Sequence, residues 1–243
     1  MIKTDTTFFT NEPGYTLHDR FKDTLKHVKY FDVLVGYFRT SGFHLLYDSL
    51  KTVKKIRILV GLNLDQKSYD VIEESRKQSS LDLESHKRTK EAFSDITSSE
   101  MDISEDNYKT EMGIKNFLNL LMEDCEDKDE DIKNGGNGKR LEFKAYPSED
   151  IHAKVYISRY DDHISDVTEG SVITGSSNFS KSGLEGNREF NVELKDPRDL
   201  KFALDQFEKL WIDSADISKE YIDTITEKTW LNESITPYEL YIK

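Results

Sequence analysis

Two short and almost wholly apolar runs, at 31–38 and 55–62, most constrain the fold of this chain. Both are rich in β-branched and aromatic residues, which is typical of strands buried on both faces. Between them, Phe43 and Leu46 share one helical face after Ser41, a residue suited to capping a helix. Strand, helix and strand at this spacing predict a βαβ unit. We therefore expect an α/β fold with a mixed, largely parallel central sheet flanked by helices.

Further elements are expected on both sides of this unit. A helix over 17–29 is indicated by Thr16 and Asp19, which have the spacing of a capping box. Apolar alternation predicts four more strands, at 141–146, 151–158, 171–174 and 190–194. Two more helices are predicted, one opening at Asp196-Pro197 and one over 218–229.

Residues 66–138 differ in character from the rest of the chain. They hold 19 acidic and 10 basic residues, a net charge of −9, whereas the remainder holds 28 and 24, a net of −4. Helical patterns dominate this segment, and Ile114, Phe117 and Leu121 form an apolar stripe within it. We therefore predict one domain over residues 1–243 that contains a helical, acidic insertion at 66–138.

Composition excludes several classes of protein. The formal charge of −13 argues against a broadly basic nucleic-acid-binding surface, although most of the acidity belongs to one segment. The apolar runs are far too short to span a bilayer, and the N-terminus lacks the apolar stretch of a signal peptide. Cys125 is the only cysteine, so no internal disulfide and no cysteine-rich metal site can form. These features predict a cytoplasmic protein with no membrane partner.

His152 and Lys154 are the first candidate site residues. On a strand, residues two apart point to the same face, so these two side chains are expected side by side while Ile151 faces the core. The same spacing occurs in His27-Val28-Lys29, but at a helix end, where side chains two apart diverge. That copy is expected on the surface. The other histidines are expected to be solvated or to cap helices: His18, His44, His86 and His163.

A polar turn follows one of the later predicted strands. Its backbone at Gly175 and Ser177 can turn amide groups toward a phosphate, and Ser176 and Asn178 add a hydroxyl and a carboxamide. Glu189 stands at the start of the next strand, where a carboxylate can orient a histidine ring by accepting its Nδ1–H. Together these groups form a candidate site for a phosphate.

Each of these patterns also has an ordinary structural interpretation. His152 and Lys154 can be a surface pair on an edge strand, and residues 175–178 can be a plain polar turn. Glu189 can form a salt bridge with Lys154 or Arg188. The occurrence of all three patterns in this order favours the site.

The order His152-x-Lys154, Gly175-Ser176-x-Asn178 and Glu189 resembles the HxK…GSxN…E core of the phospholipase D (PLD, or HKD) superfamily. Three other segments are similar to PLD-like nuclease domains of restriction enzymes and to N-terminal PLD-like domains of bacterial DEAD/DEAH-type helicases: 8–14, 31–43 and 55–63. The resemblance spans nearly the whole chain except the acidic insertion. Arg159 departs from the family pattern, which often has an aspartate there.

The resemblance implies a PLD/nuclease-like fold and a metal-independent phosphodiester hydrolase without a cofactor. One histidine attacks phosphorus to form a phosphohistidine, and a second protonates the leaving oxygen and then activates water. The implied catalytic residues are His152, Lys154, Ser176, Asn178 and Glu189, with Gly175 and Ser177 binding phosphate. Because this chemistry needs two His-x-Lys motifs and the chain has one usable copy, we expect a homodimer.

The implied partners are nucleic acid, DNA rather than RNA, and a C-terminal helicase module. Two other functions stay open. One is a catalytically weak or inactive PLD-fold module that binds a nucleic-acid backbone or a partner protein, which Arg159 and the acidic charge favour. The other is a lipid phosphodiesterase, although no segment has the pattern of a membrane-binding surface.

Overall fold

A mixed sheet forms the centre of the computed structural model, which describes residues 7–61, 82–102, 108–126, 128–133, 135–147, 151–161, 168–229 and 231. Its strands are β1 (Phe8–Thr10), β2 (Val28–Val35), β3 (Lys55–Gly61), β4 (Leu141–Tyr146), β5 (Lys154–Tyr160), β6 (Gly170–Gly175), β7 (Phe190–Leu194) and β8 (Ala215–Asp216). Its helices are α1 (Leu17–Thr24), α2 (Thr40–Leu50), α4 (Asp82–Asp102), α5 (Tyr108–Met122), α6 (Lys128–Lys133), α8 (Pro197–Ile212) and α9 (Ser218–Lys228), with a 3-10 turn η1 (Leu25–His27) and a π-helical turn η2 (Ser182–Gly186).

The strands lie in the order β1-β7-β6-β5-β2-β3-β4-β8. The predicted βαβ unit is confirmed, because β2 and β3 are parallel and α2 connects them. The mixed sheet is confirmed too, but its proportions differ from the expectation. Within the described residues two strand pairs are parallel and five are antiparallel. The reason is that β5 and β6 are joined by a connection too short for a crossover, which leaves them antiparallel.

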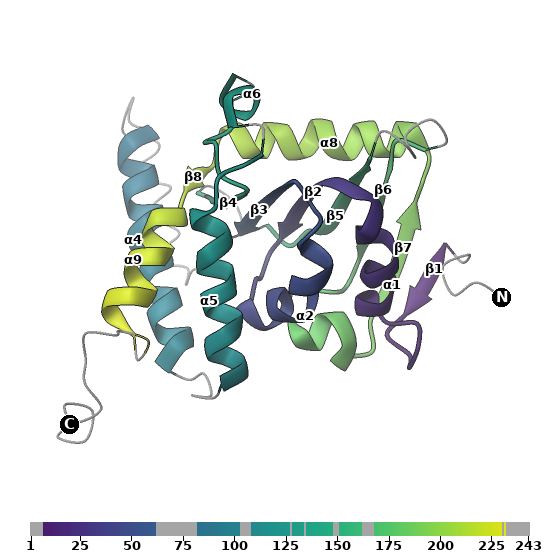
Figure 1. Cartoon of the computed structure of the whole chain (residues 1–243), viewed down its shortest axis with the longest axis horizontal. Helices are drawn as coiled ribbons and strands as arrows, with labels where there is room; N and C mark the ends of the chain where they lie inside the picture. Colours follow the sequence, from purple (N-terminus) through teal and green to yellow (C-terminus); the bar gives the residue numbers. More distant parts are fainter. Residues whose placement is uncertain are drawn as a thin grey trace.

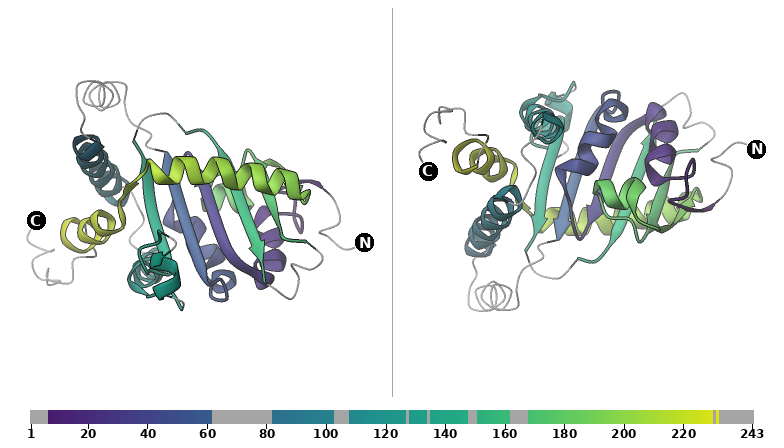
Figure 2. Two further views of the ribbon diagram at one scale, coloured as in Figure 1. Left: turned by 90° about the horizontal axis from the view of Figure 1, so that it is seen from above. Right: turned by 90° about the horizontal axis from the view of Figure 1, so that it is seen from below.

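Different helices cover the two faces of the sheet (Figures 1 and 2). Helix α8 runs across one face, where Phe207 and Trp211 pack on Leu59 and Ile157. Helices α1, α2 and α5 cover the other face and enclose the larger core. Side chains alternate between these two cores along each strand, which explains the near-continuous apolar runs of β2 and β3.

Helix α5 belongs to the larger core. Ile114 and Phe117 are fully buried, and the Phe117 ring lies 4.8 Å from that of Phe43 and 5.5 Å from that of Phe143, centroid to centroid. The acidic segment 66–138 is helical in α4, α5 and α6, and its start at 66–81 lies outside the described residues. Helices α4, α5 and α6 therefore belong to the connection between the parallel strands β3 and β4.

Helix α1 begins at the predicted capping box. The Thr16 hydroxyl accepts a hydrogen bond from the Asp19 amide at 3.0 Å, and the Asp19 carboxylate accepts one from the Thr16 amide at 3.4 Å. The helix is shorter than the predicted span of 17–29, because Val28 already pairs with Tyr160 as the first residue of β2. In the described part of the chain, no helix has the length and apolar character needed to cross a membrane.

Removal of this cap gives a test of the local structure. We expect Thr16→Ala to lower the free energy of unfolding by about 1 kcal/mol, because the first turn of α1 loses a side-chain acceptor. Urea unfolding followed by circular dichroism measures the change. Thr52→Ala, at an exposed position between α2 and β3, is the matched control and should stay within about 0.5 kcal/mol of the wild type. Equal losses in both variants would contradict the cap.

Candidate active site

The predicted site residues gather at one edge of the sheet. Three cross-strand pairs define this edge: Val35 with Lys154, Val155 with Thr174, and Gly175 with Asn191. They place the end of β2, the start of β5, the end of β6 and the start of β7 together. We call this region, with its residues 152–154, 175–178 and 189, the site edge.

His152 and Lys154 lie where the chain enters β5. His152 is exposed in the extended segment just before the strand, which begins at Lys154 rather than at Ile151. The Lys154 amine donates a hydrogen bond to the backbone oxygen of His152 at 2.9 Å. Gly36 approaches this segment closely, and its amide donates to the Ala153 oxygen at 2.9 Å. The imidazole is therefore open to a ligand, with the lysine beside it.

Gly175 has no room for a side chain. A Cβ there would overlap the carbonyl oxygen of Phe190 and would lie 2.7 Å from the Cα of Asn191. Asn191 is buried opposite it and donates from its side-chain amide to the Ser177 hydroxyl at 2.9 Å. Ser177 is also buried, and its carbonyl accepts a hydrogen bond from the Tyr156 hydroxyl at 2.8 Å. The Ser177 side chain thus points inward, which leaves its backbone amide as the group for the predicted role in phosphate binding.

Ser176 and Glu189 contact each other directly. The Ser176 hydroxyl donates to the Glu189 carboxylate and accepts from the Phe190 amide at 3.0 Å. Among the described contacts, Glu189 makes no ion pair with Lys154 or Arg188 and no hydrogen bond with His152. The pKa of the Tyr156 hydroxyl is raised, mainly because the side chain is buried and also because Glu189 is negatively charged. The carboxylate is therefore held against the turn by Ser176.

Asn178 is half-buried at the end of the same turn. Its side-chain oxygen is shielded from solvent and has no hydrogen-bond partner among the described residues. Its backbone oxygen accepts from the Ser180 amide at 2.8 Å, and a Cβ on Gly183 would overlap that oxygen. The carboxamide thus has an acceptor that the described fold does not use.

The start of α2 adjoins this turn. The Arg39 amide donates to the Phe179 oxygen at 2.9 Å, and the Lys181 amide donates to the Ser41 hydroxyl at 3.3 Å. Helix α2 begins at Thr40 with Arg39 at its N-cap, so the prediction that Ser41 caps the helix is wrong. The Ser41 hydroxyl is used to hold the turn after Asn178 instead.

Four cations near this edge have no carboxylate partner within the described residues: Arg39, Lys154, Lys181 and Arg188. Arg39 instead stacks on Tyr37, with 5.1 Å from its guanidinium carbon to the ring centroid. Other cations are neutralised, as in the pairs Arg140–Glu123 and Lys128–Asp124. These four cations are thus not neutralised by a carboxylate of the described residues, although the whole chain carries −13.

Arg159, the departure from the family pattern, lies on the other face of the sheet. Its guanidinium pairs with the buried Asp32 at 3.1 Å, and Arg57 binds the second oxygen of Asp32 at 2.6 Å. Arg57 also pairs with Glu208 of α8 at 2.7 Å. Residue 159 therefore belongs to an ion network under α8, whereas Lys154 lies on the α1 and α2 face. The arginine does not enter the site edge.

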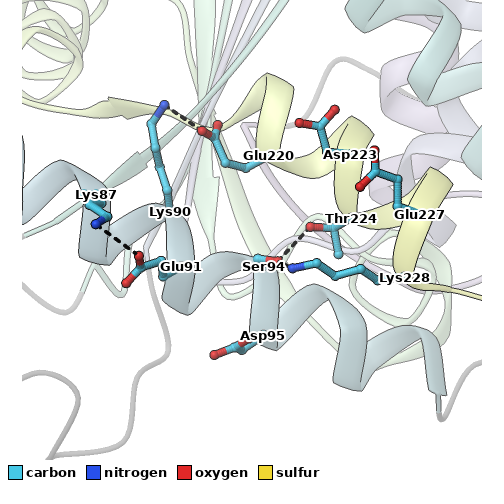
Figure 3. Close-up of a pocket in the computed structure, with 10 residues that line it drawn as sticks. All are labelled: Lys87, Lys90, Glu91, Ser94, Asp95, Glu220, Asp223, Thr224, Glu227 and Lys228. Carbon is cyan, nitrogen blue, oxygen red and sulfur yellow. Dashed lines mark hydrogen bonds and ion pairs between the residues drawn. The ribbon is translucent and has the colours of Figure 1, made fainter.

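One polar groove lies away from the site edge. A groove of about 640 Å³ runs between α4 and α9, where Lys90 pairs with Glu220 at 2.8 Å and Ser94 bonds Thr224 at 2.8 Å (Figure 3). It contains no predicted site residue. Across the described residues, no group of three or more His, Cys, Asp or Glu side chains is placed to hold a metal ion.

The histidines outside the site edge differ in environment. His27 is exposed, as expected. The prediction of a solvated or capping role for His18 is wrong, because it is buried with its Nδ1 3.1 Å from Glu185 and its Nε2 3.1 Å from the Leu45 oxygen. It joins α1, α2 and η2, all three of which pack on the same face. His163 lies outside the described residues.

Comparison with known families bears on this region. Residues 123–211 match the family model described as the PLD-like domain of cardiolipin synthase. The matched region contains His152, Lys154, the turn 175–178 and Glu189. This region is therefore similar to a PLD-like domain. The match supports the predicted family for the part of the chain that carries the site edge.

Several solved structures are similar to this chain. Nuc from Salmonella typhimurium, a phospholipase D family member, has 14% identity and a TM-score of 0.45 over 86% of this chain and 95% of its own. NucT from Helicobacter pylori has 12% identity and a TM-score of 0.44 over 86% and 96%. Phosphatidylserine synthase from Haemophilus influenzae has 15% identity and a TM-score of 0.41 over 93% and 40%. No curated protein matches the chain significantly.

Two residues that the sequence patterns did not single out support the site edge. The Asn191 side-chain amide donates a hydrogen bond to the Ser177 hydroxyl, and the Tyr156 hydroxyl donates one to the Ser177 carbonyl. A signal for Asn191 was present, since Glu189, Asn191 and Glu193 put three polar side chains on one face of a strand. Polar side chains facing a core require partners, and here the turn supplies one.

Proposed function

We propose that this chain is a metal-independent phosphodiester hydrolase that acts on nucleic acid, DNA rather than RNA, and that residues 1–243 form one PLD-like domain. The observation that carries the proposal is the register at the site edge. It sets the His152–Lys154 pair next to the turn 175–178 and Glu189, inside the region that matches a PLD-like family model. The cations near this edge that have no carboxylate partner in the described residues provide positive charge to bind a phosphodiester.

In the proposed reaction His152 is the nucleophile. A nitrogen of its imidazole bonds to phosphorus while the bond from phosphorus to the leaving oxygen breaks, which yields a phosphohistidine. A second histidine gives its proton to the leaving oxygen and then takes one from water. That water attacks phosphorus, and the phosphorus–nitrogen bond breaks to release a phosphomonoester. Lys154 stabilises the charge on the non-bridging oxygens.

The second histidine is proposed to come from a second copy of the chain. Within one chain the other His-x-Lys copy begins at His27, just before β2, whereas Lys154 pairs with Val35 at the opposite end of that strand. At about 3.3 Å per residue the separation is roughly 23 Å, too far for both imidazoles to reach one phosphorus. A two-fold dimer would bring two copies of His152 together. Light scattering should therefore give twice the mass of the chain.

The proposed setting is the N-terminal module of a helicase in the cytoplasm. The similarity of residues 8–14, 31–43 and 55–63 to PLD-like domains that precede helicase modules supports it. The single cysteine, Cys125, is in keeping with a reducing compartment.

Hydrolysis in the presence of EDTA tests the proposal. Single-stranded DNA, duplex DNA and RNA oligonucleotides are incubated with the protein and separated on denaturing gels. We expect DNA to be cleaved with EDTA present, because the proposed nucleophile and acid are both side chains. Cleavage that requires an added metal ion would overturn the metal-independent mechanism.

A catalytically inactive module that binds nucleic acid or a protein is the second candidate. It is favoured by the fixed position of Glu189, whose carboxylate is bound by Ser176. A gel shift of DNA without any cleavage would support it. Hydrolysis of a phosphatidylcholine analogue in place of DNA would point to a lipid phosphodiesterase.

A further inference from the structure

Two exposed phenylalanines lie side by side next to the site edge. Phe8 of β1 is 61% exposed and Phe190 of β7 is 60% exposed, and their ring centroids are 5.7 Å apart. Strands β1 and β7 pair so that Phe9 lies opposite Asn191, and both of these are buried. Because side chains alternate along a strand, Phe8 and Phe190 project from the other face of the sheet. We call these two rings the aromatic pair.

The aromatic pair is attached directly to the candidate phosphate site. The Phe190 amide donates to the Ser176 hydroxyl at 3.0 Å, and the Ser176 amide donates to the Phe190 oxygen at 3.1 Å. Phe190 also follows Glu189 in the chain. The backbone of Phe190 therefore adjoins the turn, and its ring projects from the α8 face at this edge of the sheet.

Burial in the fold does not account for the aromatic pair. Both rings leave most of their apolar surface in water, where each would gain free energy by being covered. Leu200 of α8, on the same side of the sheet, shows the ordinary outcome, since it is buried against the strands. An adjoining pair of uncovered rings beside a polar site indicates a surface for a ligand.

The charges nearby indicate which ligand. Arg188 lies two residues before Phe190 and has no carboxylate partner in the described residues. Lys154 lies at the same edge of the sheet, two strands away. Cations that bind phosphates, alternating with aromatic rings that stack on bases, are the composition of a site for single-stranded nucleic acid. A duplex keeps its bases stacked inside the helix and does not offer them to a ring.

We propose that Phe190 and Phe8 stack on an unpaired base next to the phosphodiester held at the site edge, which makes single-stranded nucleic acid the preferred substrate. This inference rests on the proposed function. The rings act on the neighbouring nucleotide and not on the reacting phosphorus. They therefore determine the preference for single strands rather than the chemistry.

Binding measurements with Phe190→Ala, Phe8→Ala and the double variant test the inference. The probes are a fluorescent single-stranded DNA, an oligomer of the same length with abasic sites throughout, and the matching duplex. We expect each single variant to weaken binding of the single strand about tenfold, since stacking on one ring contributes on the order of 1 to 3 kcal/mol. Binding of the abasic oligomer should not change. Phe202→Ala removes an exposed ring on α8 and serves as the control.

Several results would overturn the inference. An equal loss of affinity for the abasic oligomer or for the duplex would show that the rings do not read unpaired bases. If light scattering gives a lower mass for the phenylalanine variants than for the wild type, the aromatic pair belongs to a subunit interface instead. If the wild type cleaves DNA and the variants bind it unchanged, the stacking fails and the proposed function stands. If the wild type neither binds nor cleaves any probe, both fail.

Discussion

Replacing His152 with alanine is expected to lower the rate of DNA hydrolysis by roughly a thousandfold or more. Loss of a nucleophile leaves only the contributions of binding and charge stabilisation to the rate. The fold should not suffer, because His152 is exposed and precedes β5. Initial rates on a fluorogenic single-stranded oligonucleotide in EDTA measure the loss. A thermal unfolding curve that overlays that of the wild type shows that the variant is folded.

The chain contains its own matched control for this experiment. His27 stands in a second His-x-Lys sequence, is equally exposed, and lies at the opposite end of β2. We expect His27→Ala to hydrolyse DNA at the rate of the wild type. If both variants keep full activity, His152 is not the nucleophile. If both lose it equally, the loss does not come from the site edge.

Replacing Asp32 with alanine is expected to lower the free energy of unfolding by about 3 to 5 kcal/mol. Asp32 is 1% exposed and binds both Arg57 and Arg159, so its removal leaves two guanidinium groups under α8 without their shared carboxylate. Removing one partner of a buried ion pair is costly because the other charge stays desolvated. Urea unfolding followed by circular dichroism and tryptophan fluorescence measures the change, since Trp211 contacts Arg57.

Two further variants, Asp48→Ala and Arg159→Asp, serve as comparisons for Asp32→Ala. Asp48→Ala removes an exposed partner of Lys51 and should leave stability unchanged, because exposed pairs contribute little. Arg159→Asp restores the aspartate common in the PLD pattern, yet it should destabilise this chain because it sets a second carboxylate beside Asp32. Equal stability of Asp32→Ala and the wild type would show that the network contributes nothing.

Much of the fold followed from local patterns in the sequence. The strands at 141–146 and 190–194 have the predicted bounds, and α8 begins after the predicted Asp196 cap. These elements are periodic and are bounded by strong signals. The parallel pairing of β2 and β3 followed from the helix between them, because a crossover leaves few other topologies.

What the sequence did not predict depends on contacts between distant residues. Strand β8 has two residues and β1 has three, too few to show a period, and both form only by pairing with β4 and β7. The inward turn of Ser177 depends on Asn191, a residue 14 positions later. His18 is buried because η2, far along the chain, supplies Glu185. No local pattern identifies Glu185 as the partner of His18, or Ser177 as the partner of Asn191.

The central position of β2 has a consequence for how activity arises during synthesis. This strand is made early, yet the neighbour that completes one of its sides is β5, whose Arg159 contacts Asp32 across 127 positions of sequence. Pairing over so long a span is slow compared with local pairing, and it must wait for the later strands to leave the ribosome. Under the proposed function, a nascent chain that ends before Glu189 lacks part of the site edge, so we expect hydrolysis only after translation has passed that residue.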